Sequence, residues 1–112
     1  HRLRVSVTDD PPENAVRPAV DYLLRSANSV LDGDLLAVIM TGMGRDGQQG
    51  CRLVKQAGGS VFAQSQCDCV VFGMPKAVIE ERLADRILPL GKIAPAIVRH
   101  VKRSRRREKE TR

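Results

Sequence analysis

The sequence has few aromatic residues, few cysteines and no long apolar run. Aromatic residues make up 3% of the 112 residues and tryptophan is absent, so leucine, valine, isoleucine and alanine must fill any core. Three cysteines, with Cys67 and Cys69 in C-x-C spacing and Cys51 apart, fit neither a disulfide framework nor a zinc site. The longest apolar run, residues 35–40, is too short to cross a bilayer, and no signal peptide is visible. We expect reduced thiols in a cytoplasmic protein that does not insert into membranes.

Positive charge is concentrated at one end of the chain. The formal net charge is +6, and residues 99–112, with eight basic and two acidic residues, account for all of it. We therefore expect a neutral folded part over residues 1–98, followed by a basic helical end that becomes disordered. This placement argues against a nucleic-acid partner. An arm that binds phosphate or acidic groups in a salt-sensitive manner is the alternative.

Apolar periodicity predicts strands and helices that alternate along the chain. The expected strands are residues 3–7, 35–40, 61–63 and 87–90, and the expected helices are residues 18–31, 47–56, 75–83 and 93–102. This order predicts an α/β fold with a doubly wound, mainly parallel sheet and helices on both faces. The continuous apolar run at residues 35–40 is typical of a strand covered on both faces.

The predicted architecture indicates where a functional site should lie. In open α/β sheets, ligands bind beyond the carboxyl ends of the strands. Two loops follow predicted strands at this end, residues 41–47 and residues 64–75. Both are candidates for a site.

The first of these loops matches a dinucleotide-binding pattern. Gly42, Gly44 and Gly47 form G-x-G-x-x-G between a strand and a helix, and Asp68 lies 21 residues past Gly47. However, Asp46 would place a carboxylate beside the pyrophosphate, at a helix end that attracts anions. Asp68 also lies inside a polar loop and not at the end of a strand. The pattern is therefore a weak indication of a dinucleotide site.

Asp46 has two other interpretations. It could cap the following helix, because Gln49 three residues later completes a capping-box pattern. It could instead be a catalytic acid, since a carboxylate at the carboxyl end of a parallel strand is well placed to orient a histidine and stabilise its imidazolium form. Spacing alone does not separate these interpretations, and one residue could serve both.

Several segments, in order, resemble the CheB-type protein-glutamate methylesterases. The two most specific are T-G-M-G-R-D-G at residues 41–47 and C-V-V-F-G-M-P at residues 69–75. R-P-A-V-D at residues 17–21 precedes them, and I-L-P-L at residues 87–90 follows. The resemblance runs over nearly all of residues 3–98 and is to the C-terminal portion of that catalytic domain.

The resemblance implies a serine hydrolase with a Ser-His-Asp triad. Such enzymes remove methyl groups from methylated glutamates on chemoreceptor helices in chemotaxis signalling, and members also deamidate receptor glutamines. They require no metal or cofactor. The acid of the triad falls on Asp46. The active-site neighbourhood falls on the four residues that open the same turn, Thr41, Gly42, Met43 and Gly44.

The chain also departs from the family pattern. The nucleophilic serine and the triad histidine belong to an N-terminal half that is not in this sequence, and neither His1 nor His100 matches that histidine. Val16 stands where the family often has another histidine. We expect no catalytic role for the serines, which are at positions 6, 26, 29, 60, 65 and 104.

These departures predict a piece of a domain with incomplete catalytic machinery. The chain begins with His1 and not methionine, so we expect a fragment or a processed product. Alone it should be inactive, and it should self-associate, fold poorly or need the missing half. A non-enzymatic binding or scaffold module derived from an esterase is the alternative function, and a dinucleotide-binding half-domain is a weaker one.

Overall fold

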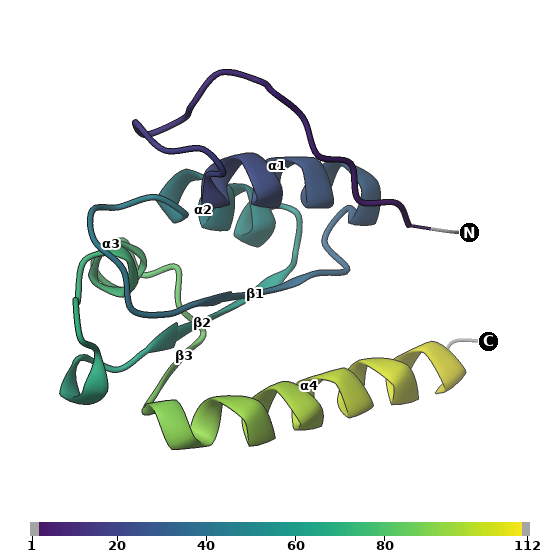
Figure 1. Ribbon diagram of the computed structural model, residues 1–112. Coiled ribbons are helices and arrows are strands. Elements are labelled where there is room, and N and C mark those ends of the chain that lie inside the picture. Colours follow the sequence, from purple (N-terminus) through teal and green to yellow (C-terminus); the bar gives the residue numbers. More distant parts are fainter. Residues whose placement is uncertain (1–2, 111–112) are drawn as a thin grey trace.

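The computed structural model describes residues 3–110 and contains an α/β fold (Figure 1). In chain order, the elements are α1 (Val20–Leu31), β1 (Leu36–Ile39), α2 (Gln48–Gln56), β2 (Ser60–Gln64), the short 3₁₀ helix η1 (Gln66–Asp68), α3 (Met74–Glu80), β3 (Arg86–Leu88) and α4 (Leu90–Glu110). From the first helix onward, this is the alternation that the sequence predicts.

The strands form one parallel sheet in the order β1-β2-β3. Leu36 pairs with Ser60 at the start of the first ladder, and Phe62 pairs with Arg86 at the start of the second. Helices α1, α2 and α3 lie on one side of the sheet and α4 lies on the other (Figure 1). The predicted parallel sheet with helices on both faces is confirmed.

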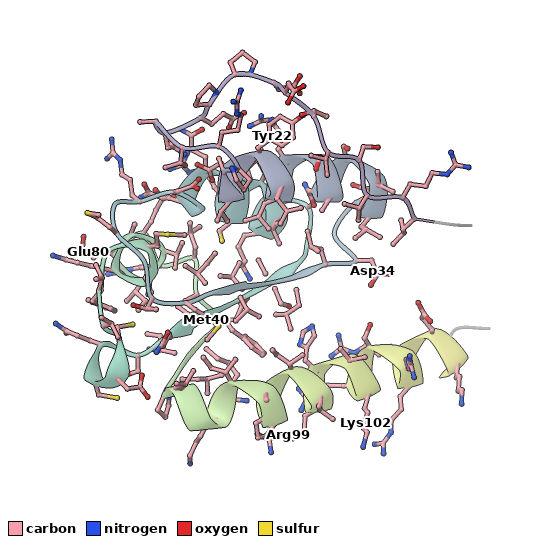
Figure 2. All side chains as sticks on the ribbon, in the orientation of Figure 1. Tyr22, Asp34, Met40, Glu80, Arg99 and Lys102 are labelled. Carbon is pink, nitrogen blue, oxygen red and sulfur yellow. The ribbon has the colours of Figure 1, made fainter. Side chains whose placement is uncertain are left out.

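Two apolar clusters hold these layers together, and their side chains fill the space on both sides of the sheet (Figure 2). The larger cluster packs α1, α2 and α3 against the sheet, and Val54, Val61 and Val78 at its centre are fully buried. The smaller cluster packs Phe62 of β2 against Ile93 and Ala96 of α4. Aliphatic side chains supply most of the core, as the shortage of aromatic residues requires.

The predicted strand at residues 3–7 is wrong. This segment has no regular structure, and Val5 and Val7 are 95% and 97% exposed. An alternating segment becomes a strand only when a neighbour supplies ladder hydrogen bonds and a face to cover. Within residues 3–110, no strand lies beside it.

Strand β1 forms an edge of the sheet among the described residues, because only β2 pairs with it. Ala37 and Ile39 are buried against the larger cluster, whereas Leu36 and Val38 on the other face are only half-buried. The expected cover on both faces is therefore complete on the side of the larger cluster and only partial on the α4 side, where Leu36 and Val38 pack against the smaller cluster. Helix α4 packs on Phe62 of β2 and Leu88 of β3 instead.

Helix α4 is longer than predicted. It begins at Leu90, where the Asp68 carboxylate accepts a hydrogen bond from the first backbone amide (2.6 Å), and it continues through the basic segment to Glu110. The predicted disorder at the very end concerns residues 111–112, which lie outside the described residues. No helix among residues 3–110 is both long enough and apolar enough to span a membrane.

Candidate active site

The two loops at the carboxyl end of the sheet are joined by hydrogen bonds. The backbone amide of Thr41 donates to Oε1 of the buried Gln64 (2.9 Å), the last residue of β2. The amide of Val71 donates to Oγ1 of Thr41 (2.8 Å), and the amide of Gly42 donates to the carbonyl of Val71 (3.0 Å). The loops that the sequence singles out separately therefore form one hydrogen-bonded unit.

The two loops approach most closely at Gly42 and Gly73. The carbonyl of Gly42 accepts hydrogen bonds from the amides of Gly73 (3.1 Å) and Met74 (2.9 Å). A Cβ atom at position 73 would lie 2.8 Å from the carbonyl oxygens of both Gly42 and Gly44. Only glycine fits this position without moving the backbone of the first loop.

Asp46 lies in this unit and is 9% exposed. Its Oδ2 accepts a hydrogen bond from the amide of Val20 (2.7 Å), and its Oδ1 accepts from the amide of Asp21 (2.9 Å) and from Nδ2 of Asn14 (2.9 Å). The carboxylate thus caps the first turn of α1, where the helix dipole favours a negative charge.

The predicted cap on the following helix is wrong. The N-cap residue of α2 is Gly47, at φ +99°, which has no side chain to cap the helix, and the Asp46 carboxylate accepts no hydrogen bond from an amide of α2 among the described residues. Asp46 instead points to α1, a helix 26 residues earlier in the chain that packs against α2. Only the tertiary arrangement brings the amino end of α1 to the carboxylate of Asp46.

A second buried carboxylate lies beside Asp46. Asp21 is 2% exposed; its Oδ1 accepts from the amide of Gly50 (2.7 Å) and its Oδ2 accepts from Nδ2 of Asn14 (2.8 Å). The amide group of Asn14 therefore donates to both carboxylates and links them. The bridge offsets the repulsion between two adjacent negative charges.

Hydrogen bonds keep Asp46 ionised. Burial acts to raise the pKa of this carboxyl, but donors from the amides of Asp21 and Val20, the side chain of Asn14 and the amide of Gly47 outweigh it, so that its pKa lies below the usual value. A carboxylate that is ionised at neutral pH, at the carboxyl end of a parallel strand, is suited to hold an imidazole in one tautomer.

Asn14→Ala should therefore weaken the site in a pH-dependent way. We expect a loss of about 1–3 kcal/mol in the free energy of unfolding at pH 7, because two carboxylates lose a donor. The stability that Asp46 provides is fully present above an ordinary aspartate pKa of about 3.9 and is lost as the pH falls through its lower folded-state pKa. Removing one donor reduces this contribution, so the variant should lose less stability than the parent between pH 7 and pH 2.5.

Guanidinium titrations at the two pH values measure both effects. Asn28→Ala is the matched control, because Asn28 makes only a long hydrogen bond to Leu53 (3.4 Å) and its Oδ1 is buried without a partner. This control should keep the pH dependence of the parent. An Asn14→Ala variant with an unchanged pH dependence would contradict the role given to the bridge.

A cavity of about 490 Å³ borders Asp46. Of the predicted neighbourhood, Met43 and Gly44 line it, and Met43 is 83% exposed. Thr41 and Gly42 do not line it; they connect the two loops behind it. Val16 also lies in the cavity wall.

The other polar residues considered in the sequence make contacts that support the fold. Asp68 accepts from the amide of Leu90 and from the side chain of Gln64. His100 makes an edge-to-face contact with Phe62 on the α4 side of the sheet, with ring centroids 5.6 Å apart. Ser26 and Ser29 donate to backbone carbonyls of α1. His1 lies outside the described residues.

Sequence reasoning missed three residues of this site: Asn14, Asp21 and Gln64. Each is polar and makes hydrogen bonds that join segments far apart in the chain. A buried polar side chain needs such partners, but a sequence does not say which side chains will be buried. The position of Asn14 between two proline-containing segments gave no signal.

The fold and the site define an α/β domain of the open parallel-sheet class with a carboxylate-centred site beyond the carboxyl ends of its strands. A sequence model described as CheB methylesterase matches residues 1–97, so the chain belongs to the CheB methylesterase family.

Relatives and a solved structure agree with this assignment. The chain is 50% identical over 103 residues to a protein-glutamate methylesterase/protein-glutamine glutaminase of Nocardioides sp., and 45% identical over 100 residues to one of Trichodesmium erythraeum. These matches cover 92% and 89% of this chain but 28% of each relative. The catalytic domain of Thermotoga maritima CheB methylesterase superposes with a TM-score of 0.78 at 48% identity, over 80% of this chain and 48% of that domain. The chain thus corresponds to a part of such a domain.

Proposed function

We propose that this chain supplies the catalytic acid of a Ser-His-Asp hydrolase and that Asp46 is this acid. The observation that carries the proposal is the fixed, ionised carboxylate of Asp46 at the edge of a cavity beyond the end of β1. No histidine among residues 3–110 lies near it, since His100 is on α4. The serine and the histidine would therefore come from the N-terminal portion of the domain.

The reaction we propose is hydrolysis of glutamate methyl esters on chemoreceptor helices. The serine Oγ attacks the ester carbonyl while the histidine accepts its proton; the histidine then protonates the departing methoxide, and methanol leaves. Water activated by the histidine cleaves the glutamyl ester and regenerates the serine. Asp46 holds the imidazole and stabilises its charged form in both steps. The same steps with ammonia as leaving group would deamidate glutamine.

The free edge of β1 is the surface where we expect the missing portion to pair. Within the described residues this edge has no partner strand, and Leu36 and Val38 are half-buried beside it. An uncovered edge and apolar face favour association with another chain. We infer that the N-terminal portion of the same domain occupies this position, and that self-association replaces it when the chain is alone.

The free thiols of all three cysteines agree with a reducing compartment, and we place the protein in the cytoplasm.

Reconstitution tests this proposal. The chain alone should release no methanol above background from a methyl-esterified receptor, whereas its complex with an N-terminal portion taken from the Thermotoga maritima domain should do so. The same complex with the nucleophilic serine of that portion replaced by alanine is the control. Turnover by the isolated chain would contradict the proposal. A stable complex without turnover would favour the non-enzymatic binding module.

A further inference from the structure

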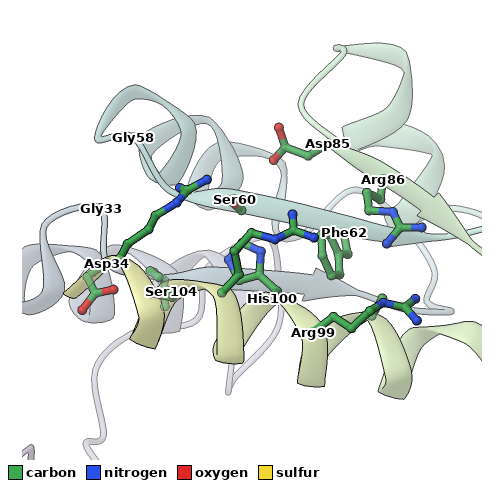
Figure 3. Close-up of a pocket in the computed structure, with 14 residues that line it drawn as sticks. Gly33, Asp34, Gly58, Ser60, Phe62, Asp85, Arg86, Arg99, His100 and Ser104 are labelled. Carbon is green, nitrogen blue, oxygen red and sulfur yellow. The ribbon is translucent and has the colours of Figure 1, made fainter. Parts of the chain in front are cut away.

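A second pocket lies at the opposite end of the sheet from Asp46. It has a volume of about 380 Å³ and lies between α4 and the amino ends of the strands, where Ser60 opens β2 and Arg86 opens β3 (Figure 3). Phe62 and Ala96, which are 3% and 1% exposed, also line it. The pocket is therefore anchored on the core between the sheet and α4.

Arginines dominate the charge of this pocket. Arg86 reaches it from β3, and Arg99, Arg103 and Arg107 reach it from α4. Figure 3 shows the guanidinium groups of Arg86 and Arg99 extending from opposite walls on the same side of the pocket. The guanidinium groups of Arg86, Arg99 and Arg103 have no ion pair or hydrogen bond with the residues whose side chains the structure describes, 3 to 109.

The carboxylates nearby do not neutralise these arginines. Asp85 also lines the pocket, but its carboxylate pairs with Lys55 (2.6 Å) and accepts from the amide of Val61 (2.8 Å). Among the side chains that the structure describes, Asp34 is the only other acidic lining residue. The pocket therefore keeps an excess of positive charge.

The spacing of the arginines on α4 is costly in the absence of an anion. Arg99 and Arg103 are four residues apart, so two like charges lie side by side along one helix face. They also lie beyond residue 97, where the match to the methylesterase family ends. A bound anion would offset their mutual repulsion.

We propose that this pocket binds a phosphate-type dianion, either inorganic phosphate or a small phosphomonoester. Guanidinium groups present paired donors that match phosphate oxygens, and Arg99, Arg103 and Arg86 supply them from two walls. The hydroxyls of Ser60 and Ser104 add neutral donors. The volume lies in the range of small-molecule sites, and Phe62, which lines the pocket, would contact the organic part of a phosphomonoester.

Titration with inorganic phosphate and with phenyl phosphate tests the proposal. Amide chemical shifts of the ¹⁵N-labelled full chain, followed at constant ionic strength, should change saturably around Ser60, Arg86 and residues 99–104 and not around Asp46. Tighter binding of phenyl phosphate would identify a phosphomonoester, and equal affinities would identify inorganic phosphate. The titrations use whichever preparation unfolds cooperatively, the chain alone or its complex with the N-terminal portion.

Two double variants with the same change in charge separate a built pocket from diffuse attraction. Arg99→Gln/Arg103→Gln removes two pocket arginines and should raise the dissociation constant about tenfold or more, because charge-assisted hydrogen bonds are lost. Lys102→Gln/Arg105→Gln alters the same helix outside the pocket lining and should leave the dissociation constant within about twofold. Figure 2 shows Lys102 on the side of α4 away from the sheet. Equal weakening by both double variants, or no saturable binding at millimolar probe, would overturn the proposal.

Discussion

Asp46→Asn should lower ester hydrolysis by the reconstituted domain by up to about 10⁴-fold, as loss of the orienting aspartate does in a serine protease. Asparagine keeps the shape of the side chain but removes the charge that stabilises the imidazolium form. One carboxylate oxygen is replaced by an amide nitrogen, which cannot accept from the amides of Val20 or Asp21 or from the side chain of Asn14. A loss of about 1–3 kcal/mol in the free energy of unfolding should accompany the loss of activity.

A matched variant separates these two effects. Like that of Asp46, the carboxylate of Asp85 accepts hydrogen bonds from the backbone (the amide of Val61, 2.8 Å) and from a side chain (Lys55 Nζ, 2.6 Å). Unlike Asp46, it lies at the amino end of the sheet. Asp85→Asn should therefore lower stability without lowering the turnover of the folded complex. Methanol release is measured per folded complex, whose fraction is obtained from circular dichroism. Similar turnover in the Asp46→Asn and parent complexes would remove Asp46 from the catalytic machinery.

Gly73→Ala should have the second largest effect, because it separates the two loops that form the site. The new methyl group would meet backbone atoms of Gly42 and Gly44 at 2.8–2.9 Å, and backbone atoms do not turn aside as flexible side chains do. We expect a loss of about 1–3 kcal/mol in stability from overpacking. We also expect turnover of the reconstituted domain to fall about 10²-fold, since a displacement of about 1 Å in a catalytic constellation has this effect.

Gly91→Ala is the control for this substitution. Gly91 lies in the first turn of α4, and a Cβ atom there would have no neighbour within 4 Å. Alanine is the better helix former, so this variant should match or slightly exceed the parent in stability and should keep its turnover. Thermal unfolding and methanol release measure both variants. Parent-like behaviour of Gly73→Ala would show that the loops tolerate separation.

The site also links the stability of α1 to the chemistry we propose. Asp46 caps α1, and Asp21 of α1 accepts a hydrogen bond from Gly50 of α2. A Cβ atom on Gly50 would lie 2.6 Å from Cβ of Leu24, so the two helices are in close contact. Movement of α1 would therefore displace the carboxylate.

Local patterns of apolar residues correctly predicted the helices and strands whose packing partners lie within this chain. The run at residues 35–40 became β1, and the glycines around residues 58–59 end α2 as expected. Residues 3–7 have the alternation of a strand but remain irregular, because alternation gives a side-chain pattern and not a pairing partner. Leu23 and Leu53, which fit the inward faces of their helices, are 61% and 38% exposed. The packing of α1 against α2 therefore buries fewer of their apolar side chains than the apolar pattern predicts.

The sequence by itself determined the class of fold, and it predicted the end of the sheet and the residue, Asp46, at which we propose the site. Strand and helix periodicities are local, and strands connected in parallel place their following loops at one edge. Only the tertiary structure decided what the carboxylate of Asp46 binds. Its donors come from Asn14 and from the start of α1, 25 to 32 residues away, and they reach it because α1 packs on α2. Hydrogen-bond partners of buried polar groups depend on packing between distant segments, which no local pattern specifies.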